Sequence, residues 1–262
     1  MKYAARSDVG KVRSQNEDAW SVIPGPGGHP AGFAVADGMG GHEAGEVASR
    51  MAIDAIAEAI GRCAADRLES GEAEAVLRAG VESANLRILH YSRDQLGGIP
   101  SGTTLTAGLL SGRTLLLVHI GDSRAYLFRD GVIRQLSRDH TYVAELVSSG
   151  LIRPEEAHTH PERNKITRAL GFEPGLAPDI LRTSLREDDQ LLLCTDGLTE
   201  YVGEEEMSAV LSREDPESAA ERLVTTANER GGRDNTTVVI ARIGPGDLRQ
   251  TDGPDGYRGE QA

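Results

Sequence analysis

The chain has 262 residues and a formal net charge of −13. Its length suits one large sheet-rich domain, and its acidity argues against a nucleic-acid partner, because proteins that bind phosphate backbones need basic patches. No uncharged run approaches the ~20 residues that span a bilayer, and residues 1–6 lack the apolar stretch of a signal peptide. We therefore expect a cytoplasmic protein with no membrane partner.

The first part of the chain predicts short strands followed by two long helices. Extended runs separated by Gly, Pro and Asn occupy residues 2–7, 19–23 and 31–36, a pattern that favours an antiparallel meander. Apolar residues then recur at helical spacing over residues 43–60 and 72–95. The apolar stripe on each helix needs a sheet to cover.

The second part of the chain returns to strands. Strands are expected at residues 104–110, 113–120, 124–129, 132–136, 179–184, 190–195 and 236–243, with a helix at 216–230. Asp130-Gly131, between two apolar runs, is a strong hairpin signal. Because strands and helices come in blocks and do not alternate, we predict an α+β fold with two antiparallel sheets packed face to face and helices outside.

Two segments depart from this pattern. Residues 138–170 are polar, with short helical pieces, and predict an insertion on the surface of the domain. Residues 244–262 are polar and contain Gly and Pro throughout, which predicts a disordered tail. We therefore expect one domain over residues 1–243, followed by the tail.

Acidic residues recur where an apolar run meets a turn. Asp18 follows Glu17, Asp37 opens a glycine-rich turn, and Asp196 and Asp234 stand in similar positions later in the chain. Each one alone is compatible with an ordinary turn, cap or helix start. Together they indicate one convergent site for hard divalent cations, which take oxygen ligands. Two such ions held about 3.5–4 Å apart activate water against a phosphate ester.

Six motifs carry a resemblance to a known family. In chain order they are Ser7-Asp8-x-Gly10-x-x-Arg13-x-x-Asn16-Glu17-Asp18, Asp37-Gly38-Met39-Gly40-Gly41-His42, Ser101-Gly102-Thr103-Thr104, Gly121-Asp122-Ser123-Arg124, Asp196-Gly197-Leu198 and Gly232-Arg233-Asp234-Asn235-Thr236-Thr237. In this order they resemble the bacterial branch of the metal-dependent protein phosphatases of the 2C type, over residues 3–243. The resemblance implies a four-layer α-β-β-α sandwich, with a flap subdomain at about residues 138–170.

The resemblance also implies an activity and a set of metal ligands. The activity is hydrolysis of phosphoserine and phosphothreonine in proteins, with Mn²⁺ or Mg²⁺ as cofactor. Asp37 would bridge two metals, Gly38 would offer its backbone carbonyl to one, and Asp196 and Asp234 would hold the other. Asp18 would act through waters or as a direct ligand. A water or hydroxide bridging the metals would attack phosphorus, because bound cations lower the pKa of water.

Four further residues concern a third metal, the phosphate and the leaving group. Asp122 matches the residue that, with the equivalent of Asp196, binds the family's weaker third ion. Arg13 matches its phosphate-binding arginine, and a guanidinium grips two phosphate oxygens at once. Met39 stands where eukaryotic relatives carry a histidine that protonates the leaving oxygen. His42 is a candidate general acid, since imidazole titrates near neutral pH; a role in starting the next helix, and metal-bound water as the acid, stay open.

We therefore predict a stand-alone, monomeric serine/threonine protein phosphatase. Its partners would be phosphorylated proteins, including a cognate serine/threonine kinase. A catalytically silent phosphoprotein-binding relative is disfavoured by the intact acidic positions, and a phosphatase dedicated to one regulatory partner is disfavoured by Arg13 and the flap segment. A binding protein for divalent ions without catalysis would be expected to carry a contiguous calcium loop, which the sequence lacks.

Overall fold

Two antiparallel sheets form the centre of the molecule in the computed structural model, which describes residues 1–40, 43–66, 70–157, 159–245 and 247–248. Sheet A has the order β1-β11-β10-β7-β8, with strands Lys2–Asp8, Thr236–Arg242, Gln190–Cys194, Arg124–Arg129 and Val132–Gln135. Sheet B has the order β2-β3-β5-β6-β9, with strands Asp18–Pro24, Pro30–Met39, Leu105–Ser111, Thr114–Ile120 and Asp179–Ser184. The short β4 (Gly102–Thr103) pairs with β3.

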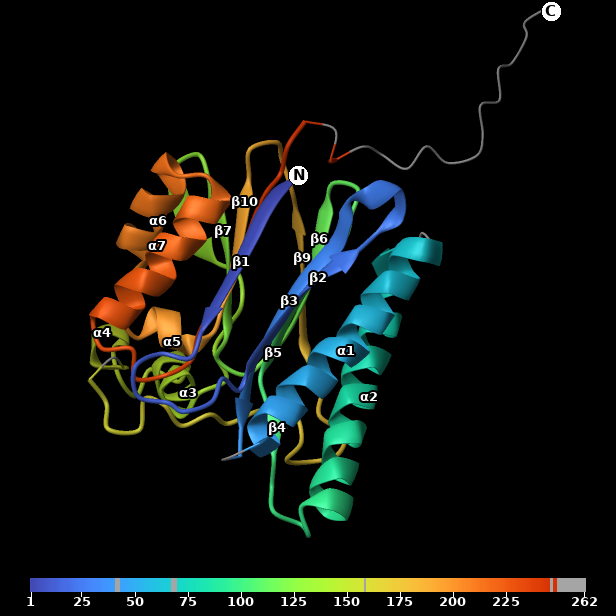
Figure 1. The fold of residues 1–262 in the computed structure, drawn as a ribbon, viewed down its shortest axis with the longest axis vertical. Coiled ribbons are helices and arrows are strands. Elements are labelled where there is room, and N and C mark those ends of the chain that lie inside the picture. The colour runs from blue at the N-terminus through green and yellow to red at the C-terminus, as the bar shows by residue number, and fades with distance from the viewer. Residues whose placement is uncertain (41–42, 67–69, 158, 246, 249–262) are drawn as a thin grey trace, which may run out of the picture.

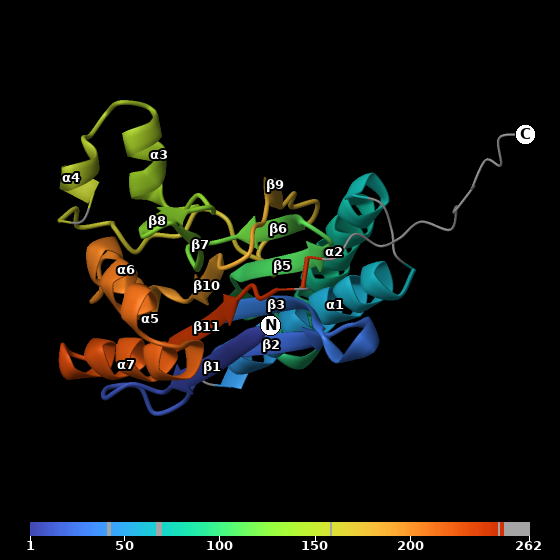
Figure 2. The ribbon, with the colours of Figure 1, turned by 90° about the horizontal axis from the view of Figure 1, so that it is seen from above.

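Helices cover the outer face of each sheet (Figures 1 and 2). The long helices α1 (Glu43–Asp66) and α2 (Ser70–Gln95) lie on sheet B, whereas α6 (Glu204–Arg213) and α7 (Pro216–Glu229) lie on sheet A. The short α5 (Asp196–Thr199) follows β10, and a 3-10 turn, η1, spans Pro26–Gly28. The predicted α-β-β-α sandwich is therefore confirmed.

Three apolar layers hold the sandwich together. The layer under α1 and α2 contains Ile56 and Leu77, the layer between the sheets contains Phe33, and the layer under α6 and α7 contains Tyr126 and Leu223. Successive side chains of a strand point to opposite faces of its sheet, so β3 alternates between the first two layers along its length. This alternation fixes the register between neighbouring strands, and the register in turn sets which polar residues lie opposite each other at the strand ends.

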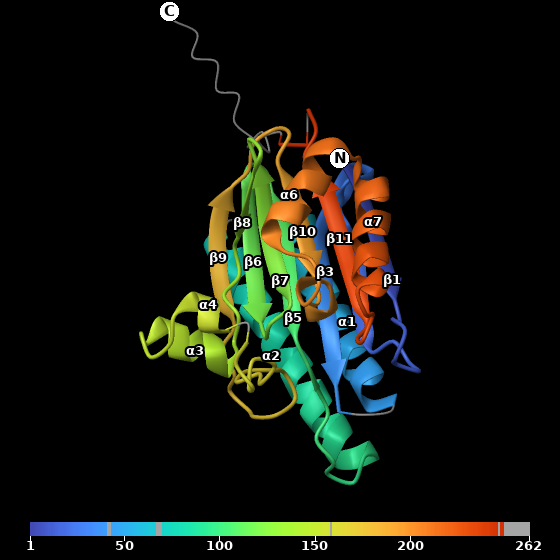
Figure 3. The ribbon, with the colours of Figure 1, turned by 90° about the vertical axis from the view of Figure 1, so that its left-hand side faces the viewer.

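The polar insertion lies outside the layers (Figure 3). It contains two short helices, α3 (Tyr142–Ser148) and α4 (Pro154–Ala157). An isolated bridge between Thr141 and Ile166 joins the two ends of the insertion to each other. A second bridge, between Thr103 and Leu170, joins the insertion to β4. This segment is called the flap below.

Several elements differ from the sequence predictions. β3 continues to Met39, because the β4 segment pairs with its end and turns the expected glycine-rich turn into strand. α1 runs six residues past the predicted end at residue 60, to Asp66. Helix α6 was not predicted, although its acidic first turn and its buried residues Met207, Val210 and Leu211 follow the pattern of an amphipathic helix. β4 was also not predicted.

The predicted tail begins later than expected within the described residues. The Asp247 carboxylate accepts hydrogen bonds from the amino group of Met1 at 2.9 Å and from the Gly244 N–H at 2.7 Å. Leu248 is buried in the layer between the sheets. The disorder predicted for residues 249–262 lies outside the described residues. Among the helices that the structure describes, none has the length and apolarity needed to cross a bilayer.

Candidate active site

The first pair of predicted metal ligands faces each other across two neighbouring strands of sheet B. Asp18 begins β2 and lies opposite Asp37 near the end of β3. Gly38 follows in β3, and its N–H donates to the Glu17 carbonyl at 3.1 Å. A Cβ on Gly38 would lie 2.2 Å from the Gly45 carbonyl oxygen in α1. Only glycine fits there, because real Cβ contacts do not approach so closely.

Two threonine hydroxyls of sheet A orient the Asp18 carboxylate. Thr195 Oγ1 donates to Asp18 Oδ2 at 2.9 Å and Thr237 Oγ1 donates to the same oxygen at 2.6 Å. The other carboxylate oxygen, Oδ1, is buried and has no hydrogen-bond partner. Asp18 is therefore held by sheet A through one oxygen, and the other is available for a ligand.

The last two predicted ligands come from the ends of β10 and β11. Asp196 is the first residue of α5, directly after β10, and Asp234 lies two residues before β11. A Cβ on Gly197 would lie 2.0 Å from the Asn235 carbonyl oxygen, so the two loops are in backbone contact. The glycine of an Asp-Gly sequence that looks like an ordinary turn is required here by this contact.

Asn235 joins the loop that carries Arg13 to the rest of the site. Its Oδ1 accepts the Glu17 N–H at 2.8 Å, and its Nδ2 donates to the carbonyls of Val9 at 3.0 Å and Gln15 at 2.9 Å. Arg13 Nη2 in turn donates to Asp234 Oδ2 at 2.8 Å. Residues 9–17 are thus fixed against the start of β11, with the guanidinium beside the carboxylates.

Asp122 occupies the turn by which the chain passes from β6 of sheet B to β7 of sheet A. The following residue, Ser123, is fully buried, and its Oγ lies 2.7 Å from Thr104 Oγ1. Thr104 Oγ1 also accepts the Asp37 N–H at 2.8 Å. This chain of hydrogen bonds ties the position of the Asp122 turn to that of Asp37.

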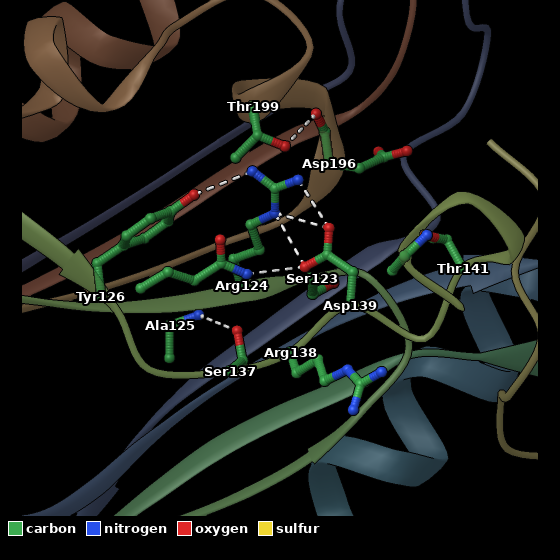
Figure 4. A network of polar contacts seen from close by, with 12 residues as sticks. Ser123, Arg124, Ala125, Tyr126, Ser137, Arg138, Asp139, Thr141, Asp196 and Thr199 are labelled. Carbon is green, nitrogen blue, oxygen red and sulfur yellow. Dashed lines mark hydrogen bonds and ion pairs between the residues drawn. The ribbon is translucent and has the colours of Figure 1, made fainter. Parts of the chain in front are cut away.

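Arg124 connects the same turn to the base of the flap (Figure 4). Its Nε lies 3.0 Å from both carboxylate oxygens of Asp139, and its Nη2 donates to Asp139 Oδ2 at 2.7 Å. Nη1 donates to the Tyr126 hydroxyl at 3.2 Å. Gln135 Nε2 donates to Asp139 Oδ1 at 2.8 Å. The guanidinium thereby holds the residue at which the flap begins.

These elements converge on one pocket of about 440 Å³. Of the eight residues predicted for the site, those lining it are Arg13, Asp37, Gly38, Asp122, Asp196 and Asp234. Asp18 does not line the pocket but is electrostatically coupled to Asp37, whose pKa it raises. His42 lies outside the described residues.

Burial and mutual repulsion raise the pKa values of the pocket carboxyls. Loss of hydration is the largest cause in each case, and it raises the pKa of Asp18 to about 7, of Asp122 to about 8 and of Asp196 to about 6. The pKa of Asp37 is raised well above its usual range by the same loss of hydration and then by the charges of four other aspartates, including Asp234. A site built this way favours bound positive charge.

The residues fit a divalent cation. The Oδ1 atoms of Asp18 and Asp196 are buried without hydrogen-bond partners, which is costly for a carboxylate unless a cation neutralises it. Within the described ranges, no group of three or more His, Cys, Asp or Glu side chains is arranged so that these side chains alone could hold a metal ion. Ions held here would take backbone and water oxygens as well, as hard cations commonly do.

The sequence matches a known protein family. A family model described as Protein phosphatase 2C matches residues 11–231. The chain belongs to the protein phosphatase 2C family. The serine/threonine protein phosphatase PstP of Mycobacterium tuberculosis is 44% identical over 252 residues, which cover 96% of this chain and 46% of that protein. The serine/threonine phosphatase stp of Listeria monocytogenes is 39% identical over 236 residues, covering 90% and 93%.

Solved structures of serine/threonine phosphatases agree with the fold. The crystal structure of the M. tuberculosis PstP/Ppp has a TM-score of 0.83 at 42% identity and covers 93% of this chain and 98% of that one. A structure of the PstP catalytic domain in complex with two manganese ions has a TM-score of 0.80 with the same coverage. This member of the 2C family spans about half the length of full PstP and nearly all of the Listeria relative.

Several residues of this phosphatase 2C site were not predicted from the sequence. Asn164 and Ile166 of the flap line the pocket, and no local pattern marks them because the approach of the flap is a tertiary contact. Asn235 and Thr237 did stand inside a quoted motif, next to Asp234. Their polar side chains at a strand start were the available signal, and both prove to position neighbouring parts of the site.

Proposed function

We propose that this chain is a metal-dependent serine/threonine protein phosphatase that hydrolyses phosphoserine and phosphothreonine in proteins, with Mn²⁺ or Mg²⁺ as its cofactor. The observation that carries the proposal is the convergence of carboxylates from both sheets on one pocket, with Arg13 beside them. Family membership supports it, because the relatives described above are named serine/threonine phosphatases and one structure contains manganese.

The proposed site would hold two ions. Asp37 would be a ligand of both, the Gly38 carbonyl would be a ligand of one, and Asp196 and Asp234 would hold the other. Asp18 acts on the same ions directly or through water, oriented by its two threonine hydroxyls. Bound divalent cations would supply charge neutralisation and a water of lowered pKa for attack at phosphorus. Asp122, which lines the pocket with Asp196, is the proposed ligand of a third ion.

Arg13 is the proposed phosphate anchor. The guanidinium donates to Asp234 through one nitrogen, and a guanidinium has further N–H groups arranged as a fork that matches two phosphate oxygens. Burial of the anionic substrate among carboxylates requires such a donor in addition to the ions. Met39 lines the pocket, but its thioether has no proton to donate. His42 stays the candidate general acid.

The proposal extends to the partners of the protein. The substrates are phosphorylated proteins, among them a serine/threonine kinase of opposite action. We further propose a monomer that works in the cytoplasm.

The test uses p-nitrophenyl phosphate and a phosphothreonine peptide. Hydrolysis should require Mn²⁺ and stop when a chelator is added. Asp37→Asn should abolish turnover and weaken Mn²⁺ binding measured by calorimetry, whereas Asp54→Asn, on the exposed face of α1, should change neither. Arg13→Ala should raise KM for the peptide. Turnover that persists in chelator would overturn the mechanism, and Mn²⁺ binding without turnover would indicate a catalytically silent relative.

A further inference from the structure

A second pocket, of about 280 Å³, adjoins the catalytic pocket. Its apolar lining residues are Ala169, Phe172 and the two that it shares with the catalytic pocket, Met39 and Ile166, and its polar ones are Thr167, Arg168 and Glu173. We propose that this flanking pocket binds an apolar side chain of the protein substrate, close in sequence to the phosphorylated residue. The inference rests on the proposed phosphatase activity and names a feature of its substrates.

The wall of the flanking pocket is continuous with the catalytic strand. Met39 pairs with Gly102 of β4, and a Cβ on Gly102 would lie 2.3 Å from Phe172 Cε2. The Phe172 ring therefore lies directly against the backbone that pairs with Met39. A peptide whose phosphate enters the catalytic pocket passes this surface when it leaves on the Met39 side.

Phe172 is exposed by a rigid turn. Phe172 is 51% exposed, whereas Asn85, whose side chain holds the turn, is 1% exposed. Asn85 Oδ1 accepts the Gly171 N–H and Asn85 Nδ2 donates to the Glu173 carbonyl, both at 2.7 Å. Gly171 has a φ of +91°, which favours glycine. The buried side chain of Asn85 in α2 thus fixes both neighbours of an aromatic residue that is about half exposed.

The exposed part of the Phe172 side chain contributes little to folding, because burial is what makes apolar surface stabilising. Phe172 lines the pocket together with Met39, Ile166 and Ala169, and contiguous exposed apolar surface of this kind marks a binding surface. The continuity of this pocket with the catalytic pocket identifies the occupant as a part of the same substrate.

The charges lining the pocket favour an apolar occupant over a second phosphate. Arg168 lines it, but its Nη1 is engaged with His140 Nε2 at 2.8 Å and with Asp179 Oδ1 at 3.0 Å, and its Nη2 with the Ala177 carbonyl. Its charge is balanced by Asp179. Glu173 also lines the pocket and adds negative charge. A second phosphoryl group would meet repulsion there.

The experiment compares phosphothreonine peptides that differ at one neighbouring position. A reference peptide has serine at the two positions on each side, and four others carry a single leucine at one of them. We expect kcat/KM to rise about tenfold for a leucine at one position, which corresponds to about 1.4 kcal/mol. Phe172→Ala should remove this preference and Phe172→Leu should retain part of it, with folding checked by circular dichroism.

Leu151→Ala is the matched control. Leu151, in the flap, is an exposed apolar residue like Phe172, at 71%, but it lines neither pocket, so the leucine preference should survive. Equal kcat/KM for all five peptides, or a preference that survives Phe172→Ala, would overturn the flanking-pocket proposal. Wild-type dimerisation that is lost in Phe172→Ala would assign the pocket to a second copy and overturn it too. Failure to cleave any peptide would instead count against the phosphatase activity.

Discussion

Replacing Asp18 with asparagine should stabilise the protein in the absence of metal. The substitution removes a buried charge but keeps an acceptor oxygen for the hydroxyls of Thr195 and Thr237. The pKa of Asp18 is raised from 3.8 to about 7, mainly by loss of hydration. Between these pH values the folded protein holds a proton that the unfolded chain lacks, so the free energy of unfolding falls as pH rises through the window.

The size of the effect follows from that proton. One such group changes the free energy of unfolding by about 1.4 kcal/mol per pH unit, and over the whole window by at most about 4 kcal/mol. The charges of Asp196 and Asp234 contribute to the raised pKa of Asp18, and the remaining carboxyls of the pocket can take up part of the proton binding in the variant. We therefore expect a difference of about half this maximum in the free energy of unfolding. In chelator, Asp18→Asn should match the wild type at pH 4.5 and exceed it by about 2 kcal/mol at pH 8.

Saturating Mn²⁺ should reverse the order at pH 8. A ligand that binds only the folded state stabilises it by about 2.7 kcal/mol at one hundred times its Kd, and the variant has lost one of the charges that attract the ion. The assay is urea unfolding followed by circular dichroism at four pH values, with chelator or with Mn²⁺. Parallel pH profiles of the two proteins in chelator, or equal stabilisation by Mn²⁺, would refute the reasoning.

Two further substitutions test how the site is built. Gly38→Ala should destabilise the fold by about 2 kcal/mol and abolish turnover, since the new Cβ meets the Gly45 carbonyl oxygen at 2.2 Å; urea unfolding at wild-type stability would contradict this. Arg124→Lys should cost about 2 kcal/mol, because lysine cannot reproduce the forked contact with Asp139. Arg6→Lys, at an exposed ion pair with Glu217, is its control and should unfold like the wild type.

Features with a local cause could be predicted from the sequence. Asp130-Gly131 connects β7 and β8 as expected, and both residues have positive φ, 53° and 81°, which that hairpin turn requires. The metal-ligand candidates could also be found, because each motif combines an acidic residue with the glycine or threonine that its packing needs. Gly38 and Gly197 are examples, since each lies in contact with a backbone oxygen from another segment.

Features that depend on contacts between distant segments could not be predicted. The end of β3 was expected to be a turn, and it is a strand because Gly102 and Thr103 pair with it. Asn235 is a common turn residue by its sequence, and only the packed structure shows that it holds residues 9–17. The flap residues Asn164 and Ile166 reach the pocket through the same kind of long-range contact.

The carboxylates of the pocket are divided between the two sheets. Asp18 and Asp37 belong to sheet B, Asp196 and Asp234 flank strands of sheet A, and Asp122 lies where the chain crosses between them. A cation bound by both groups is a cross-link between the halves of the sandwich. Its occupancy then sets how readily the halves separate, so amide protons on both sheets should lose their protection from exchange together when the ion leaves. A cation in the proposed site would therefore also hold the two sheets together.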